Sequence, residues 1–186
     1  MTNKYELITS DTKKDIFDKT VYRIRALEQI GLIAAGTLGG YVQSTDNLSL
    51  DHLGAWVSGN AMVSGDAMVS GNATVFGDAT VSGDATVFGN ATVFGNAKVS
   101  GNAKVSGDAR VSGDATKTPI VIQGDLTWTV TITDYHIRIG CQFHTIADWE
   151  KFDDKTIWAM DCRALSFWKD HKSVIFDIIK AAGRSA

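Results

Sequence analysis

The sequence predicts a mainly β protein whose centre is a solenoid of short extended segments. From Val57 to Ala115 the chain repeats the pattern V-x-G-[N/D]-A-x, so that a valine returns at every sixth position. A helix with a period of about 3.6 residues would scatter these valines around its axis, and each glycine would cost it about 1 kcal/mol. A short fixed repeat is typical of a solenoid, in which each unit buries its apolar side by stacking on its neighbours.

Each repeat unit divides into an extended part and a corner. Valine is β-branched and suits a strand, while the glycine supplies a positive φ and the following Asn or Asp tolerates a turn. Side chains alternate along a strand, so valine and the alanine four places later point inward and the residues flanking valine point outward. The inside is therefore predicted to be a column of valine and alanine.

The V-x-G-[N/D]-A-x repeat resembles the hexapeptide repeat of left-handed parallel β-helices. In that family three hexads form one triangular coil of about 18 residues, and the resemblance also implies the left-handed sense. We expect residues 36–117 to form this β-helix, residues 1–35 to form a β cap, and residues 118–186 to form strands followed by helices. Pro119 marks the last boundary, because proline cannot donate to a strand ladder.

With three hexads in a coil, the outward residues fall on three faces. The first face carries an aromatic column of Trp56, Phe76 and Phe94, the third carries Phe88, and the second is polar. A monomer does not normally expose such an apolar strip. We expect it to pack against another subunit or against the C-terminal segment, and a stacking platform for a ligand ring is the alternative.

Three cations occupy equivalent outward positions near the end of the repeat. Lys98, Lys104 and Arg110 fall one on each face and form a basic girdle. Cations on a β surface discourage pairing between edges, and this role in solubility is the main expectation. Anion binding is the functional alternative.

The residues before the repeat are expected to cap the solenoid, whose open end would expose bare strand edges. Residues 4–9 and 21–27 are predicted to be strands, and residues 11–18 a turn. Arg23 and Arg25 share one side of the second strand. Such a pair is expected to form a solvated or salt-bridged face, and a clamp for phosphate or carboxylate is the alternative.

The residues after the repeat predict strands and then helices. Three strand-like stretches, PIVIQ, LTWTVTITD and YHIRIGCQF, indicate a small antiparallel unit. Thr145 and Asp148 are placed for a helix N-cap with a weak capping box. Residues 155–182 indicate one long helix, or two helices broken near residues 169–172. We expect their apolar side chains to cap the solenoid or to pair between subunits.

The chemically capable side chains gather near the third of these strands. His136, Arg138 and His144 have the same parity, so in an unbroken strand they would share a face and could meet an anion. Cys141 and His144 suggest a metal pair or a thiol nucleophile, but their opposite parity argues against it. We expect structural roles first, ligand contact second and catalysis third, and neither a metal nor a cofactor.

Composition and charge indicate where in the cell the protein resides and which classes of partner they disfavour. The net charge is −3, which gives no strong attraction to nucleic acid or to a membrane. The N-terminus has no apolar signal region, and no run of about 18 apolar residues is present. Cys141 and Cys162 are expected to be reduced thiols. These features predict a cytoplasmic protein.

A second resemblance covers nearly the whole chain and concerns function. The stretches VYRIRALEQI, GTLGGYV and AWVSGNA, with the hexads and IRIGC, resemble a group of phage and prophage hexapeptide-repeat or polymer-forming proteins. This resemblance implies a bacterial host cytoplasm and carries no catalytic motif. It leads us to expect a non-catalytic binding protein, such as a counter-defence inhibitor that sequesters a nucleotide signal or blocks a host protein.

Two alternatives to that function remain open. Many left-handed β-helix proteins are acyltransferases that use a histidine base and coenzyme A, but these hexads contain no histidine, and His52 stands just before them. A structural solenoid that assembles with itself is the other alternative. A homo-oligomer is expected in either case, and the resemblance to left-handed β-helix proteins implies a trimer.

Overall fold

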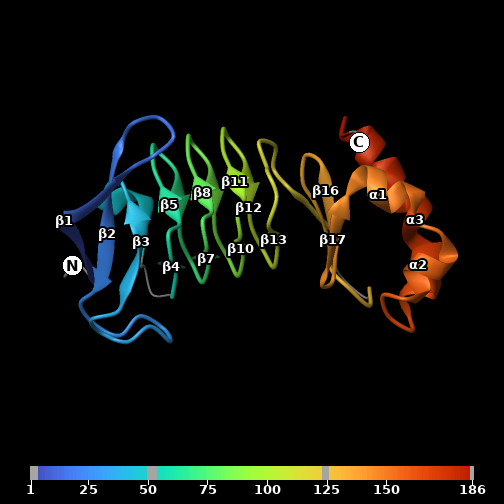
Figure 1. The fold of residues 1–186 in the computed structure, drawn as a ribbon, viewed down its shortest axis with the longest axis horizontal. Coiled ribbons are helices and arrows are strands. Elements are labelled where there is room, and N and C mark those ends of the chain that lie inside the picture. The colour runs from blue at the N-terminus through green and yellow to red at the C-terminus, as the bar shows by residue number, and fades with distance from the viewer. Residues whose placement is uncertain (1–3, 50–53, 123–125, 185–186) are drawn as a thin grey trace. The chain divides into compact units, whose positions relative to one another are not determined.

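A computed structural model describes residues 4–49, 54–122 and 126–184 of the chain. The chain divides into two compact units, Met1–Pro119 and Ile120–Ala186. Figure 1 shows the first unit as stacked coils and the second as a small sheet with helices. Among the described residues, no helix is both long enough and apolar enough to cross a bilayer.

The repeat folds into ten two-residue strands, which form three parallel ladders. Residues eighteen apart face each other: Thr74 lies opposite Thr92, and Val75 lies opposite Val93. The repeat strands have the orders β4-β7-β10-β13, β5-β8-β11 and β6-β9-β12, and the second of these ladders extends into strands that precede the repeat. This confirms the predicted three-sided parallel solenoid. The strands are β4 (Trp56–Val57), β5 (Met62–Val63), β6 (Met68–Val69), β7 (Thr74–Val75), β8 (Thr80–Val81), β9 (Thr86–Val87), β10 (Thr92–Val93), β11 (Lys98–Val99), β12 (Lys104–Val105) and β13 (Arg110–Val111).

The interior of the solenoid is the predicted column of small and branched aliphatic side chains. All ten repeat valines, from Val57 to Val111, have 0% of their surface exposed, and the repeat alanines are buried with them. At one corner the Asn72 amide donates to Asn90 Oδ1 at 3.3 Å, and the Asn90 amide donates to Asp108 Oδ1 at 3.1 Å. Backbone ladders, buried valines and this amide ladder all repeat with the coil, which makes the solenoid walls regular and stiff.

The first coil, which lies within the β-helix expected from residue 36 onward, is irregular. Strand β3 (Leu38–Val42) pairs in parallel with β5, with Val42 opposite Val63, and Leu48 bridges to Val69. This coil is therefore three residues longer than the regular coils, in which partners such as Met62 and Thr80 are eighteen residues apart. The short 3₁₀ helix η1 (Thr45–Asn47) lies within it, and the Asn47 amide donates to the carbonyls of Gly65 and Ala67 on the next coil.

An antiparallel hairpin covers the edge that β3 would otherwise leave open. Strand β1 (Tyr5–Lys14) pairs with β2 (Thr20–Ala26), and β2 pairs with β3. The predicted turn over residues 11–18 is wrong for its first part. A register shift between Ile8 and Thr12 lets β1 continue to Lys14 along the length of β2.

The two arginines of β2 form the salt-bridged face that was expected first. Arg23 Nε donates to Asp11 Oδ2 at 3.0 Å, and Arg23 also donates to the hydroxyl of Tyr41. Arg25 pairs with Glu6. Both guanidinium groups therefore bind carboxylates of their own hairpin.

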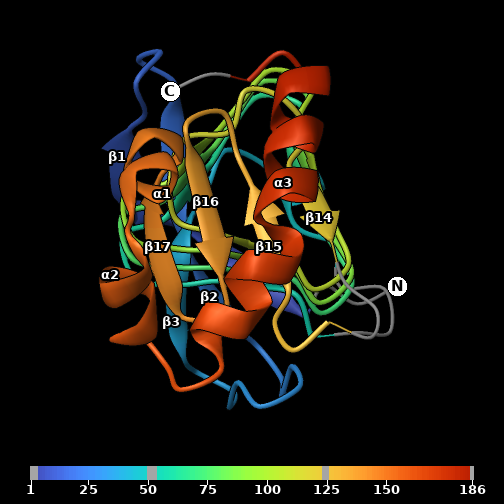
Figure 2. The same cartoon turned by 90° about the vertical axis from the view of Figure 1, so that its right-hand side faces the viewer.

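The second unit is an antiparallel meander of four strands. Strands β14 (Ile120–Ile122), β15 (Val130–Ile132), β16 (His136–Ile139) and β17 (Gln142–Thr145) pair in chain order. Helices α1 (Ile146–Lys151), α2 (Asp154–Trp158) and α3 (Ala164–Ala181) follow, and Figure 2 shows them over one side of the sheet. Thr145 caps α1 with the predicted capping box, because its hydroxyl accepts from Asp148 N at 3.0 Å.

The predicted position of the helix break is wrong. Helix α3 continues through residues 169–172, and the interruption lies at residues 159–163. Lys169 and Asp170 are exposed, so this polar stretch is the solvent side of α3 and not a gap in it. Asp161 Oδ1 accepts the N–H of Arg163 at 2.9 Å, which closes a turn immediately before α3.

The apolar side of the helices packs on the sheet of its own unit. The core joins strand residues such as Ile132 and Ile137 to Trp149, Trp168 and Ile175 of the helices. The sequence indicated instead that these side chains would cap the solenoid or pair between subunits. Most of them are buried within the C-terminal unit, but Trp158 and Val174 are 63% and 55% exposed. Capping of the solenoid and pairing between subunits stay predictions.

Candidate binding sites

The aromatic column of the first face is present, and two of its members stack. The rings of Phe76 and Phe94 have centroids 5.5 Å apart and an interplanar angle of 17°. Phe76 remains 40% exposed, whereas Trp56 is only 3% exposed. Trp56 therefore belongs to the buried base of this face, and the exposed apolar surface is formed by the phenylalanines.

A shallow groove adjoins this column near the first coils of the solenoid. Trp56 and Phe76 line it together with Leu32 and Ile33 from the segment before β3 and Leu38, the first residue of β3. Leu32 is fully exposed and Leu38 is 55% exposed. The apolar surface of the first face is thus larger than the sequence indicated, because a non-repeat segment contributes to it.

Of the other outward residues singled out in the sequence, Phe88, Lys98 and Lys104 lie on the other two sheets, and Arg110 lies at the end of the aromatic column. Phe88 is 41% exposed on the third sheet. Lys98, Lys104 and Arg110 begin β11, β12 and β13, the last strands of the three sheets, and all three are exposed. The Arg110 guanidinium lies 5.7 Å from the centre of the Phe94 ring, so the aromatic column ends at a cation. Anion binding by the girdle stays a prediction.

His136, Arg138 and His144 do not meet, and that expectation is wrong. A hairpin turn at Gly140 and Cys141 separates β16 from β17, and Ile137 lies opposite His144. Cross-strand partners share a face, so His144 points to the side of buried Ile137, while His136 and Arg138 point to the other side. In an unbroken strand all three side chains would lie on one face of the sheet, but the hairpin turn places His144 on the opposite face.

Aromatic contacts hold each of these three side chains in place. His136 stacks on Phe143 at 4.8 Å, and the Arg138 guanidinium lies 4.8 Å from the same ring. His144 meets Trp149 and Phe152 edge to face, at 5.4 and 5.0 Å. These contacts favour structural roles for the three side chains over ligand contact.

The cysteines are free and exposed, as expected for reduced thiols. Within the described ranges, no group of three or more His, Cys, Asp and Glu side chains could hold a metal ion. His52 lies outside the described residues.

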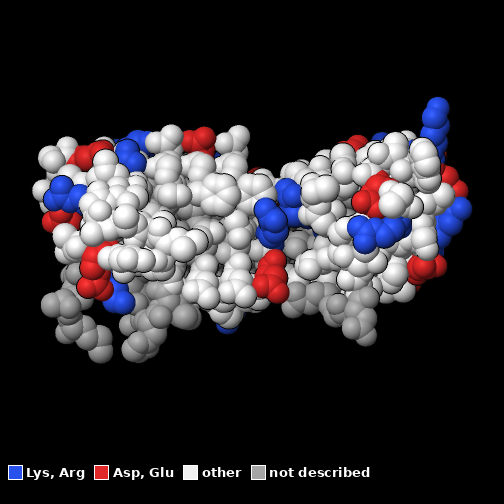
Figure 3. Space-filling model, turned by 90° about the horizontal axis from the view of Figure 1, so that it is seen from below, with Lys and Arg blue, Asp and Glu red and all other residues white. Residues whose placement is uncertain are grey.

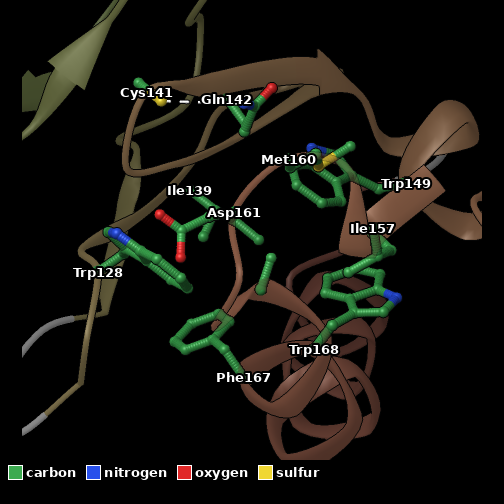
Figure 4. Close-up of a pocket in the computed structure, with 11 residues that line it drawn as sticks. Trp128, Ile139, Cys141, Gln142, Trp149, Ile157, Met160, Asp161, Phe167 and Trp168 are labelled. Carbon is green, nitrogen blue, oxygen red and sulfur yellow. Dashed lines mark hydrogen bonds between the residues drawn. The ribbon is translucent and has the colours of Figure 1, made fainter. Parts of the chain in front are cut away.

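A pocket in the C-terminal unit was not foreseen from the sequence. It lies between the β16–β17 turn and the start of α3, and Figure 4 shows its lining. Four aromatic rings form much of its wall. The lining residues are Trp128, Ile139, Cys141, Gln142, Trp149, Ile157, Met160, Asp161, Ala164, Phe167 and Trp168.

One carboxylate gives this apolar pocket its charge. Asp161 Oδ1 accepts hydrogen bonds from Arg163 N at 2.9 Å and from Arg163 Nε at 3.4 Å. The bond from the Arg163 N–H lowers the pKa of Asp161 below its ordinary value, so the carboxylate is ionised at neutral pH. Figure 4 shows the carboxylate on the side of the pocket formed by Trp128 and Phe167.

The comparisons with known proteins concern the solenoid. Residues 55–70 and 67–83 match the family model described as the YdcK Beta solenoid repeat. These stretches include β4 to β8, the first regular strands, and they are similar in sequence to known β-solenoid repeats. No curated protein matches the chain. The fold and the match together define a protein with β-solenoid repeats.

Proposed function

We propose that this protein is a non-catalytic interaction protein, in which the solenoid is a rigid scaffold and its first face binds a second copy. The observation that carries the proposal is the exposed stack of Phe76 on Phe94 beside the apolar groove. The stack and groove together form an apolar strip on a wall that also carries Thr74, Thr92 and, at its end, Arg110.

The energetics of this face favour burial. Burying apolar surface is worth about 25 cal/mol per Å², and interfaces between identical subunits are more apolar than ordinary protein surface. The solenoid wall is held by backbone ladders, so little conformational freedom is lost when a partner covers it. The exposed side chains of Phe76, Leu32 and Leu38 would contribute most of the free energy gained by burying this face.

The character of the face favours a copy of the same chain as the partner. Its outward residues on β7 and β10 are the uncharged Thr74 and Thr92, followed by the two phenylalanines. In the solenoid unit of Figure 3, broad areas are free of charged side chains. Arg110 on β13 places one cation at the end of this face, and the part that spans β7 and β10 is uncharged. Two copies can pair along that uncharged part without bringing like charges together. The trimer that the family resemblance implies is part of the proposal.

A counter-defence role in a bacterial host is a further part of the proposal, and it is supported by the resemblance to phage proteins alone. The assembled solenoid would then sequester a nucleotide or cover a host protein. Native mass spectrometry of the protein purified from infected bacteria distinguishes these cases by the added mass. Copurified coenzyme A would instead favour the acyltransferase alternative.

The scaffold proposal is tested by removing the aromatic strip. Serine occupies the same position in other units of the repeat, as Ser58, Ser64 and Ser82 show, so Phe76→Ser with Phe94→Ser should leave the coil intact. The control is Phe88→Ser, which removes an equally exposed ring from the third sheet. Light scattering should show that only the double variant dissociates. Dissociation of the control alone, or of neither variant, would refute the first face as the contact.

A further inference from the structure

The wall of the C-terminal pocket is largely aromatic and is held rigidly. Trp128 meets Phe167 edge to face at 5.2 Å, and Trp149 lies 4.9 Å from Trp168. Trp149, Phe167 and Trp168 are each less than one tenth exposed, because they belong to the core of the unit. A ligand that enters therefore meets rings that are already in place. The faces of such rings are electron-rich and attract cations.

The charge of the pocket also favours a cationic ligand. Asp161 is the one ionised side chain among the described residues that line it, and the others are apolar, aromatic or neutral. Its Oδ1 is held by the N–H of Arg163, which fixes the carboxylate at the edge of the aromatic wall. A fixed negative charge beside tryptophan rings favours an organic cation over a neutral or anionic ligand.

The size of the pocket limits what can enter. Its volume is about 70 Å³. A cavity must have a volume of about 10–15 Å³ to hold one water molecule, so this cavity could hold roughly five groups the size of a water. A methylated ammonium group fits this space. A whole nucleotide is too large, and its phosphates would be repelled by Asp161.

A cation of the chain already lies beside the same two groups. The Arg163 guanidinium is 5.2 Å from the centre of the Trp128 ring, and its Nε is 3.4 Å from Asp161 Oδ1. Its side chain is 65% exposed, so it is held loosely at the rim. Arg163 thus shows what this pair of groups attracts, and it would compete with a ligand for them.

We infer that the pocket between the β16–β17 turn and α3 binds a small organic cation, namely a methylated or quaternary ammonium group. The aromatic wall contacts the methyl groups, and Asp161 balances the charge. This binding activity goes beyond the scaffold role of the solenoid, and it does not depend on self-association.

The test uses the full chain and two probes that differ only in charge. Choline carries a quaternary ammonium, and dimethylbutanol is its uncharged isostere with carbon in place of nitrogen. Calorimetry and tryptophan fluorescence follow the binding of each. Asp161→Asn removes the charge and keeps the oxygen that accepts from Arg163. Asp170→Asn, at an exposed site on α3, is the matched control.

We expect saturable choline binding that is about tenfold or more tighter than binding of dimethylbutanol. Asp161→Asn should weaken choline binding about tenfold, Asp170→Asn should leave it unchanged, and Arg163→Ala should tighten it. Equal binding of the two probes would overturn the inference, since it would show an apolar pocket only. Failure of both the natural chain and the Arg163→Ala variant to bind millimolar choline would also overturn it.

Discussion

Phe94 stacks on Phe76 one coil along the solenoid, with ring centroids 5.5 Å apart. The contact is a direct result of the repeat, because residues eighteen apart occupy equivalent positions on adjacent coils, as Thr74 and Thr92 do. The two rings therefore contribute in two ways, to the stability of the coil stack and to an exposed apolar surface.

These two contributions can be measured separately. In a double-mutant cycle with Phe76→Ser and Phe94→Ser, the coupling energy of the ring pair should be about 0.5–1.5 kcal/mol. Urea unfolding of the two single variants, the double variant and the natural chain measures it. Dilution below the range of self-association isolates the contribution within one chain. A coupling near zero would show that the stack does not stabilise the coil.

The corner glycines offer a second test, with a matched pair of sites. Gly83 has a φ of +70°, and a Cβ there would lie 3.1 Å from the backbone N of Gly101 on the next coil. Gly95 has a similar φ of +66°, but a Cβ there would meet nothing within 4 Å. Gly95→Ala should cost about 1–2 kcal/mol of unfolding free energy for the left-handed backbone alone.

Gly83→Ala should cost more than Gly95→Ala, because the coils must also separate slightly. Chemical denaturation compares the two variants under the same conditions. Equal losses would mean that coil spacing adjusts freely at the corners, contrary to the stiff solenoid described above.

The stability of the N-terminal hairpin should depend on pH, because the ionised Asp15 carboxylate stabilises it. Burial of this carboxyl raises its pKa, but the hydrogen bonds that it accepts outweigh burial, so its pKa lies below the ordinary value. Two of these bonds come from the N–H groups of Phe17 and Lys19, each at 2.8 Å. A carboxyl with a lowered folded pKa stabilises the fold above its unfolded pKa, which is about 3.9.

That contribution is lost as the pH falls through the folded pKa. Asp15→Asn should therefore be less stable than the natural chain at pH 7, and the difference should shrink below about pH 4. Urea unfolding over this range measures it. A difference that stayed constant down to pH 2 would contradict the assignment to the ionised form.

The cap of α1 gives a prediction for the C-terminal unit. The Thr145 hydroxyl accepts from Asp148 N at 3.0 Å. Thr145→Ala should lower the stability of this unit by about 1 kcal/mol, and Thr145→Ser, which keeps the hydroxyl, should cost less. Thermal unfolding followed by tryptophan fluorescence reports mainly on this unit, because it holds four of the five tryptophans of the chain. An equal loss in both variants would show that the cap is not responsible.

Much of the solenoid could be predicted because its pattern is local and repeated. The period of six placed every valine, and stacking in threes placed Phe76 over Phe94 and Lys98, Lys104 and Arg110 on separate sheets. The extension of β1 to Lys14 was missed, since a bulge and pairing with β2 override the polar composition of that stretch.

The C-terminal pocket could not be predicted in the same way. Its wall combines residues from the loop before β15, the β16–β17 turn, all three helices and the turn before α3. Trp128, Trp149 and Trp168 look like ordinary core residues in the sequence, and Asp161 looks like a solvated loop residue. Only the tertiary packing brings the carboxylate to the rings. The same limit explains the error at His144, where a hairpin turn changed which side chains share a face.

The most direct test of the scaffold role is sedimentation equilibrium of the natural chain at micromolar concentrations. The self-associating solenoid predicts a mass that is a multiple of the 20.0 kDa chain, and three chains if the family habit holds. A mass of 20.0 kDa across the whole concentration range would contradict it, because the first face would then remain open to water.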